Sequence, residues 1–196
     1  RRSPEELLAA MDRSPRRDIR KAGRDGMDLR RVTAEADVRA VLDVYRETAQ
    51  RAGFALHSDD YYLAVHRELG ERSVLVAAYA DDAPTCFSWC VQSGRTSFQL
   101  YGGSNEAGRR MRATPPVYWR TVEIAQEAGL ERFDFNGLLN DGISAFKRSL
   151  ASHDDELVGT LDVPFSWRYG LWVRALPRAK RVLRALRGGA RRPGAS

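Results

Sequence analysis

Phe146 and Lys147 stand side by side in the stretch ISAFKRSL, residues 143–150. Lysine is rare in this chain, because only three of its 32 basic residues are lysines and arginine supplies the rest. An ammonium group on a flexible stem can approach one oxygen atom as a point charge, whereas a planar guanidinium suits a fork-shaped partner. Lys147 is therefore a candidate for contact with an oxygen of a reacting group. A helix-surface lysine in a salt bridge is the alternative.

The sequence offers no signal for covalent catalysis. A Gly-x-Ser-x-Gly motif does not occur, and the three histidines, His57, His66 and His153, are isolated and accompany no cysteine. Cys86 and Cys90 lie four residues apart in one predicted strand. Their Cα atoms are then separated by about 13 Å, which excludes a disulfide between them. We expect both cysteines to be reduced residues of the core, and we expect no metal site.

Apolar periodicity and turn residues predict the elements that must position Lys147. Helices are predicted to begin at Ser3 and Ser14, and to run from Thr33 to Gly53, from Ser58 to Gly70 and over residues 115–129. Strands are predicted at residues 27–32, 72–80, 85–93, 96–104, 131–137 and 156–164, which are rich in β-branched and aromatic residues. A short helix carrying Phe146 and Lys147 lies between the last two strands.

The predicted order is β-α-α-β-β-β-α-β-α-β, that of an α/β protein with one mixed sheet and helices packed on it. This order is similar to that of the acyl-CoA N-acyltransferase fold, called GNAT-like. Acetyl-CoA enzymes of that fold hold the pyrophosphate on a glycine-rich turn of the type Q/R-x-x-G-x-G/A before a helix. The corresponding stretch, GGSNEAGRRMRATPPVYW, lacks this spacing, and Pro115 and Pro116 remove two amide donors. We therefore expect the fold without a coenzyme A site.

The expected organisation is one GNAT-like domain at residues 28–165, with shorter segments on either side. A helical connection is predicted at residues 1–27, a basic amphipathic helix at 166–188 and a disordered end at 189–196. No uncharged run of the sequence, residues 73–80 included, is long enough to cross a bilayer, and the N-terminus is charged rather than apolar. We expect a cytoplasmic protein.

The predicted helix at 166–188 concentrates positive charge. Nine basic residues and no acidic residue follow Phe165, so the net charge of +6 comes entirely from this end of the chain. Apolar residues fall on one side of the helix, namely Leu171, Trp172, Ala175, Leu176, Ala179, Leu183 and Leu186. Pro177 is expected to kink or restart the helix. The protein's own domain, an anionic membrane surface, a polyanion and plain solvation all remain open for this helix.

Four stretches of the chain carry a more specific signal. They are RRDIRKAGRDG, YRETAQRAGFALHSDDYY, LYGGSNEAGRRMRATPPVYWRTVEIAQEAGLERFDFNG and GISAFKRSLASHDDELVG, which together span about residues 14–160. In type, order and spacing they resemble the FemABX family of tRNA-dependent aminoacyl transferases, which includes lipid II glycyltransferases. Family members usually carry two acyltransferase-like domains and a helical insertion. The resemblance implies that this chain corresponds to the second domain and the connection into it.

The resemblance implies that an amine of a cell-wall stem peptide attacks the ester linking an amino acid to the 3′ end of its tRNA. An activated ester needs no covalent enzyme intermediate, so such an enzyme mainly positions its substrates and stabilises the oxyanion. The family lysine at the position of Lys147 meets the developing negative charge, and the phenylalanine at that of Phe146 packs beside it. No cofactor is implied, because aminoacyl-tRNA is the co-substrate.

The resemblance also implies residues that bind substrate. Arg51 matches a family arginine that holds substrate phosphate, and Tyr101 matches an aromatic wall of the same pocket, next to Gly102. Asn136 is a further candidate for substrate contact, and Asp134 is a candidate general base or orienting carboxylate. The alternatives are a cation at a helix C-terminus for Arg51, a core aromatic for Tyr101 and a turn-capping carboxylate for Asp134.

Basic residues near both ends are candidates for contact with tRNA phosphates or another anion. They are Arg16, Arg20, Lys21, Arg178 and Arg181, and a solvated helix surface is the alternative for the first three. The implied partners are aminoacyl-tRNA and a peptidoglycan precursor, in the form of lipid II or a nucleotide-linked stem peptide. Peripheral contact with the inner face of the membrane is a third expectation.

Two other functions remain open at this point. The first is a tRNA- or CoA-dependent N-acyltransferase that modifies a small-molecule or peptide amine in specialised metabolism. The second is a catalytically silent domain that binds nucleic acid or membrane through its basic end. Turnover with charged tRNA separates the aminoacyl transferase from the silent domain, and turnover with acetyl-CoA alone separates it from an ordinary acetyltransferase.

Overall fold

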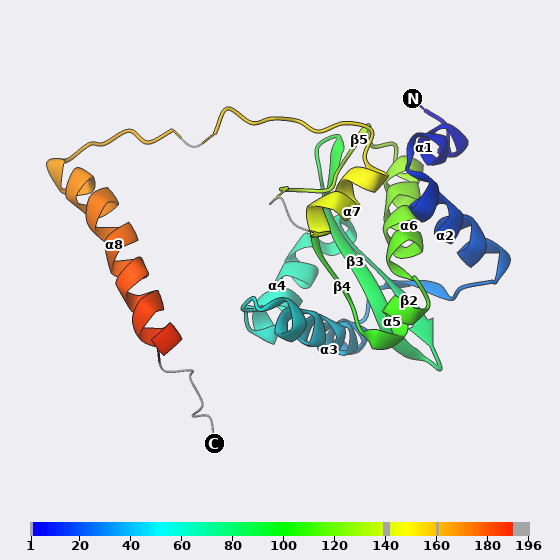
Figure 1. Cartoon of the computed structure of the whole chain (residues 1–196). Coiled ribbons are helices and arrows are strands. Elements are labelled where there is room, and N and C mark those ends of the chain that lie inside the picture. Colours follow the sequence, from blue (N-terminus) through cyan, green and yellow to red (C-terminus); the bar gives the residue numbers. More distant parts are fainter. Residues whose placement is uncertain (1, 139–141, 160, 190–196) are drawn as a thin grey trace, which may run out of the picture. The chain divides into compact units, whose positions relative to one another are not determined.

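The computed structural model describes residues 2–138, 142–159 and 161–189 of the chain (Figure 1). Its elements, in order, are α1 (Pro4–Ala10), α2 (Arg13–Arg24), β1 (Leu29–Val32), α3 (Glu35–Ala52), α4 (Asp59–Leu69), the 3-10 turn η1 (Gly70–Arg72), β2 (Ser73–Ala80), β3 (Ala83–Ser93), β4 (Thr96–Ser104), α5 (Glu106–Arg110), α6 (Thr114–Glu127), β5 (Arg132–Asp134), α7 (Gly142–Leu150) and α8 (Trp167–Gly189). The chain divides into two compact units, Arg1–Asp154 and Asp155–Ser196, and the sheet belongs to the first.

The strands form one mixed sheet in the order β1-β2-β3-β4-β5. The first four are antiparallel to their neighbours, and β5 pairs with β4 in parallel. The α/β class and the single mixed sheet are therefore confirmed, and so is the predicted order of elements from β1 to α7, apart from the additional short helix α5. Parallel pairing of β4 and β5 requires a crossover connection, and α5 and α6 supply it.

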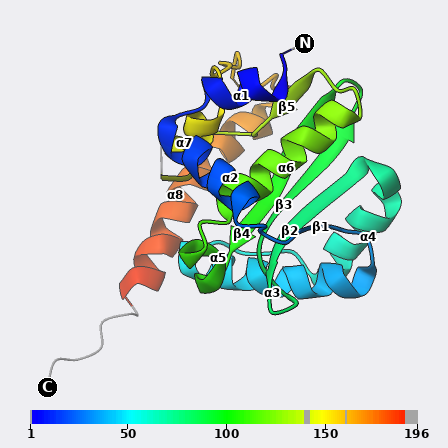
Figure 2. The same ribbon diagram turned by 90° about the vertical axis from the view of Figure 1, so that its right-hand side faces the viewer.

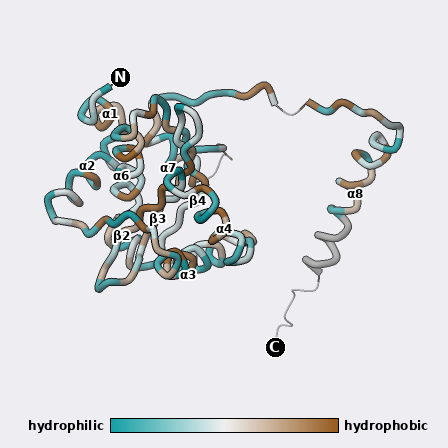
Figure 3. The backbone as a smooth tube through the Cα atoms, turned by 180° about the vertical axis from the view of Figure 1, so that it is seen from behind, coloured by the Kyte–Doolittle hydropathy of each residue, from teal (hydrophilic) through white to brown (hydrophobic). Residues whose placement is uncertain are grey.

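Helices cover both faces of the sheet, as the two views in Figures 1 and 2 show. One core cluster joins Leu75, Phe87 and Trp89 of the sheet to α3 and α4, whereas the other joins Val76 and Cys86 to α6. Alternate residues of a strand point to opposite faces, so a strand buried on both sides is apolar throughout. Figure 3 shows this hydrophobic colour along β3 in the interior.

The N-terminal helices pack on α6 and α7. Ser3 and Glu6 form the expected capping box at the start of α1. Met11 and Ile19 are buried in a cluster with residues of α6 and with Leu150 of α7. The backbone N–H of Asp12 also donates to the carbonyl of Ser149 at 2.9 Å. Residues 2–27 thereby hold α7, which carries Lys147, against the rest of this unit.

Several predicted helix ends are confirmed, but α2 begins at Arg13 with Asp12 rather than Ser14 as its N-cap. Gly53 closes α3 at a φ of 74°, where glycine avoids the steric penalty of a side chain, and the hydroxyl of Ser58 caps α4. The N-cap of α3 is Ala34 rather than Thr33, and its side chain makes no capping bond. The carbonyl of Thr33 instead accepts a hydrogen bond from Nε2 of His66 at 3.1 Å.

Cys86 and Cys90 are reduced and buried, as expected. Burial raises the pKa of each thiol to about 11, because a thiolate would lose its hydration in the core. Among the described residues, no group of three or more histidine, cysteine, aspartate or glutamate side chains could hold a metal ion.

The strand predicted at residues 156–164 is wrong. The described residues of this stretch have no regular secondary structure, and Leu157 and Val158 are 85% and 94% exposed. Gly159 adopts a φ of +90°, which interrupts an extended backbone. An apolar β-branched pattern becomes a strand only when a neighbouring strand supplies hydrogen bonds, and the edge strand β5 is three residues long.

The basic helix is present as α8, which runs from Trp167 to Gly189 with Pro177 in its interior, so the proline does not restart it. Residues 190–196, most of the end expected to be disordered, lie outside the described residues, as do the side chains of Leu183 and Leu186. In the part of the chain that the structure describes, no helix combines the length and the apolar character needed to span a bilayer.

Candidate active site

An open stretch of the β4 edge defines the centre of the candidate site. Strand β5 pairs with β4 only over Thr96–Phe98, but β4 continues to Ser104. The β3–β4 register is shifted in this region, since Trp89 pairs with Tyr101 and Cys90 pairs with Gln99. Leu100 is therefore an extra residue on β4, a β-bulge.

Because of the bulge, the side chains of Gln99 and Tyr101 point to opposite faces of the sheet. Tyr101 packs with the rings of Tyr62 on α4 and Trp89 on β3, at centroid distances of 5.2 and 5.6 Å. Nε2 of Gln99 donates to the hydroxyl of Tyr118 on α6 at 3.1 Å and to the carbonyl of Tyr101 at 3.0 Å. Without the extra residue, side chains two positions apart would share one face.

Gly102 allows α6 to approach the β4 backbone closely. A Cβ atom at this position would come within less than 3.0 Å of the Tyr118 hydroxyl and would lie 3.0 Å from Nε2 of Gln99. The pKa of Tyr118 is raised, chiefly by desolvation, so its phenol stays neutral at physiological pH. Gly102 therefore serves a packing role at the position where substrate contact was predicted.

Phe146, on α7, contacts this centre through Tyr118, and Lys147 is the next residue of the same helix. The Phe146 ring meets the Tyr118 ring edge-on at a centroid distance of 5.3 Å. Nζ of Lys147 donates to the carbonyl of Gly137 at 3.1 Å and lies 3.5 Å from that of Asn136. These carbonyls belong to the segment after β5, so the ammonium is held at the junction between β5 and α7.

Asp134 and Asn136 shape that junction. The carboxylate of Asp134 accepts the backbone N–H of Asn136 at 2.8 Å, and the Asn136 side chain accepts the N–H of Gly137 at 2.7 Å. Asn136 has a φ of +63°, a left-handed conformation that asparagine tolerates. Asp134 thus caps the turn, in line with its alternative interpretation, and both residues orient the carbonyls that hold Lys147.

Arg51 lies at a different point on β4. Nη1 of Arg51 and Nη1 of Arg109 donate to the carbonyl of Ser104 at 3.0 and 2.9 Å. Arg109 also lies 3.7 Å from the carboxylate of Glu47. Two guanidinium groups therefore converge on the C-terminal end of β4, an arrangement that suits a phosphate.

Tyr101 lies in an aromatic cluster on the α3 and α4 side. Its hydroxyl is 3.5 Å from that of Tyr61, which is exposed, and its ring is 5.9 Å from that of Tyr45. Desolvation is the main cause that raises the pKa of Tyr101, and the hydrogen bond with Tyr61 adds to it. The structure therefore brings Asp134, Asn136, Phe146 and Lys147 together and joins Phe146 to Gly102 through Tyr118. Arg51 meets Arg109 at Ser104, and Tyr101 packs among the rings of α3, α4 and β3.

Sequence analysis missed Tyr118, Gln99 and Arg109. Tyr118 follows Pro115-Pro116 and has the spacing of an ordinary core residue of a helix. The only signal was the pair Gly102-Gly103 in a strand, since glycine there marks close approach of another group. Which group approaches depends on the packing of α6, a long-range contact.

The predicted anion contacts are spread over two units. Arg16 donates to the carbonyl of Ala9 at 3.0 Å, Lys21 pairs with Asp25, and Arg20 is exposed, all on α2. Arg178 donates to the carbonyl of Arg174 at 3.2 Å, within α8. These groups are described separately, because they belong to different compact units.

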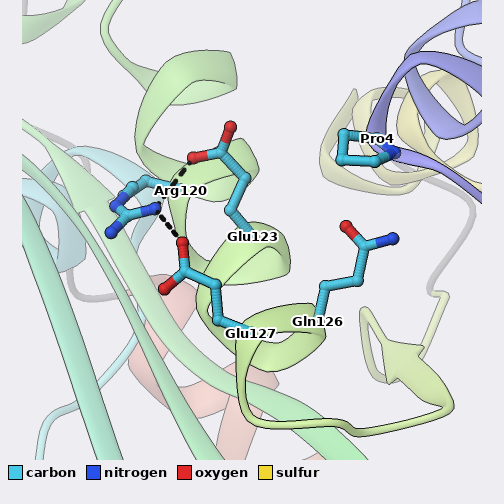
Figure 4. Close-up of a pocket in the computed structure, with 5 residues that line it drawn as sticks. All are labelled: Pro4, Arg120, Glu123, Gln126 and Glu127. Atoms are coloured by element: carbon cyan, nitrogen blue, oxygen red, sulfur yellow. Dashed lines mark hydrogen bonds and ion pairs between the residues drawn. The ribbon is translucent and has the colours of Figure 1, made fainter.

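A pocket lies between α1 and the outer surface of α6 (Figure 4). It is lined by Pro4, Arg120, Glu123, Gln126 and Glu127. Arg120 pairs with Glu123 at 3.1 Å and with Glu127 at 2.8 Å, so its charge is already matched. None of the predicted site residues lines this pocket.

Comparison with known proteins gives consistent matches. A family model described as an acetyltransferase (GNAT) domain matches residues 10–148. An aminoacyltransferase FemB from Staphylococcus epidermidis is 32% identical over 80 residues, which are 41% of this chain and 19% of that protein. The chain thus spans about a fifth of the length of the curated relatives that it matches.

Solved structures share the fold. A crystal structure of FemX superposes with a TM-score of 0.68 at 15% identity, over 76% of this chain and 56% of that one. The aminoglycoside 6′-N-acetyltransferase AAC(6′)-Ih from Acinetobacter baumannii superposes with a TM-score of 0.56 at 16% identity, over 71% of this chain and 99% of that one.

Proposed function

From the premise that this chain belongs to the acetyltransferase (GNAT) domain family and is of the FemABX type, we propose a function. The chain transfers an amino acid from aminoacyl-tRNA to an amine of a peptidoglycan precursor. The observation that carries the proposal is the position of Lys147. Its ammonium lies at the β5–α7 junction, beside Phe146, which packs on Tyr118 beneath the open edge of β4. Acyl transfer passes through a tetrahedral oxyanion, which a fixed cation stabilises.

The reaction makes one bond and breaks another. The acceptor amine forms a C–N bond with the carbonyl carbon of the aminoacyl ester, which gives a tetrahedral oxyanion. The C–O bond to the tRNA ribose then breaks, and the proton lost by the amine goes to the ribose oxygen. Lys147 stabilises the oxyanion by its charge, and the capped turn of Asp134 and Asn136 holds it ready before substrate arrives.

Arg51 and Arg109 are proposed to bind the phosphate groups of the precursor. Both guanidinium groups point at the Ser104 carbonyl and are fixed there by it, so little conformational entropy is lost when an anion binds. Tyr101 and the exposed ring of Tyr61 would line the same side of β4. This arrangement separates a phosphate-binding part of the site from the reacting centre at Lys147.

The proposal is tested by direct transfer from charged tRNA. A mixture of radiolabelled aminoacyl-tRNAs is offered with a nucleotide-linked stem peptide to the protein. We expect label in the peptide, and none when free amino acid and uncharged tRNA replace the charged tRNA. Absence of transfer to either a nucleotide-linked or a lipid-linked precursor would contradict the proposal.

Acetyl-CoA is expected to bind poorly. The segment between β4 and α6 lacks the glycine spacing that would direct amides at a pyrophosphate, and α6 begins with prolines that have no N–H group. Calorimetry should therefore detect no binding tighter than about 1 mM, or about −4 kcal/mol. Micromolar binding, with acetylation of a small amine in the absence of tRNA, would favour a CoA-dependent N-acyltransferase instead.

A further inference from the structure

Many apolar side chains are exposed in the segment that begins near Leu157. Val158 is followed by exposed side chains at Leu161, Val163, Phe165 and Trp167. Helix α8 then presents Leu171 and Trp172, which are 57% and 60% exposed. Large apolar side chains gathered in one segment mark an interaction surface rather than an ordinary solvated one.

Most apolar residues of helix α8 and a stripe of its arginines fall on different sides of the helix. Leu171, Trp172, Ala175, Leu176 and Ala179 follow helical spacing and share one side. A second set, Arg174, Arg178 and Arg181, recurs at intervals of four and three residues and therefore forms a stripe on the other side. The guanidinium of Arg168 lies 5.7 Å from the centroid of the Trp167 ring at the start of the helix.

Helix α8 itself contains no acidic residue that would offset this stripe. The last acidic residue of the chain is Asp162, and nine basic residues follow it. A surface that combines a basic stripe, an apolar side and tryptophan matches a layer that is anionic outside and apolar beneath.

We propose that α8 binds the surface of an anionic phospholipid bilayer and lies parallel to it. The apolar side enters the boundary between headgroups and acyl chains, and the arginine stripe contacts the phosphates. A nucleic acid would use the arginines but would leave Leu171 and Trp172 exposed to water. A second copy of the helix would cover the apolar side but would bring two basic stripes together. Charge complementarity with an anionic membrane accounts for both sides of the helix.

Vesicle sedimentation of the full chain tests this proposal. Vesicles of phosphatidylcholine with phosphatidylglycerol should bind the protein at least tenfold more tightly than vesicles of phosphatidylcholine alone. The variant R174Q/R178Q/R181Q should lose at least tenfold in affinity at low salt, and high salt should reduce the difference because it screens the charges. The control R24Q/R39Q/R72Q removes the same charge from exposed positions on the first unit and should bind like the wild type.

A second variant distinguishes a membrane from other partners. L171S/W172S should also lose at least tenfold in vesicle affinity, with little dependence on salt. A blue shift of Trp172 emission on binding, absent in W172F, should report its entry into the apolar layer. Circular dichroism and thermal unfolding should show that the first unit remains folded in every variant.

Three results would overturn the proposal. One is equal binding to neutral and anionic vesicles. Another is tighter binding to tRNA than to vesicles, with L171S/W172S unaffected. The third is a concentration-dependent dimer that W172S abolishes, with no vesicle binding. None of these results excludes transfer from aminoacyl-tRNA, so the failure of this proposal can be distinguished from a failure of the proposed function.

Discussion

Lys147→Met is expected to lower the turnover number about 100- to 1,000-fold, while the Michaelis constants for both substrates change much less. Methionine keeps much of the volume of the lysine stem but removes the charge that faces the developing oxyanion. The loss therefore falls on the transition state rather than on ground-state binding. Single-turnover transfer from preformed aminoacyl-tRNA is the appropriate measurement, because it isolates the chemical step.

Two further variants test whether the ammonium group of Lys147 itself is required. Lys147→Arg should also be impaired, because the wider guanidinium cannot present one point charge between the carbonyls of Asn136 and Gly137. Arg148→Gln removes the neighbouring charge on α7, which pairs with Asp154 at 2.7 Å on the surface, and should stay within about threefold of wild type. A Lys147→Met protein that is folded and turns over within threefold of wild type would show that Lys147 is not catalytic.

Tyr118→Ala is expected to lower the free energy of unfolding by about 3–5 kcal/mol, the usual cost of removing a large buried aromatic side chain. The ring touches Phe135 and Phe146, and its hydroxyl lies against Gly102. Deletion leaves a cavity between α6, α7 and β4 that the packed surroundings can only partly fill. Urea denaturation measures the change.

Tyr118→Phe separates the ring from its hydroxyl. The ring and its contact with Phe146 remain, but Nε2 of Gln99 loses one acceptor, so we expect a loss of only about 0.5–1.5 kcal/mol. If Tyr118 positions Phe146 and thereby Lys147, Tyr118→Phe should retain most of the turnover. A Tyr118→Ala variant that costs less than about 1 kcal/mol would refute the role of this ring as the support of α7.

The pH dependence of stability offers a second readout for Tyr118. Desolvation raises the pKa of Tyr118 above its ordinary value of 10.0, so the folded state keeps the phenolic proton more tightly than the unfolded state does. The corresponding stabilisation is complete below pH 10 and is lost as the pH rises above that value. Tyr118→Phe should therefore show a shallower fall in stability at high pH. Cys86, Cys90, Tyr45, Tyr79 and Tyr101, whose pKa values are also raised, contribute to the remaining slope.

Much of the fold could be predicted because its signals are local. Ser58 and Gly53 mark helix ends through the conformations that only certain residues adopt readily. The antiparallel strands β2, β3 and β4 follow one another through short turns, so their pairing is also nearly local. Lys147 could be singled out because its type is rare in this chain.

The predicted strand at residues 156–164 failed for the opposite reason. Its β-branched residues indicate that the segment can adopt an extended conformation. A strand forms only when a neighbouring strand supplies hydrogen bonds, and the position of that neighbour depends on the rest of the fold. The exposed side chains of Leu157 and Val158 instead belong to the unit that contains α8.

The sequence by itself determined the class of the fold, the order of its elements within the sheet unit, the charge of α8 and the identity of the residue pair Phe146-Lys147. Only the tertiary structure decided that Leu100 is a bulge, that Tyr118 connects Gly102 to Phe146, and that Arg51 and Arg109 meet at Ser104. The physical reason is the separation along the sequence between the residues that interact. Helix caps, turns and periodicity depend on neighbours along the chain, whereas these contacts join residues that are brought together only when the helices pack on the sheet.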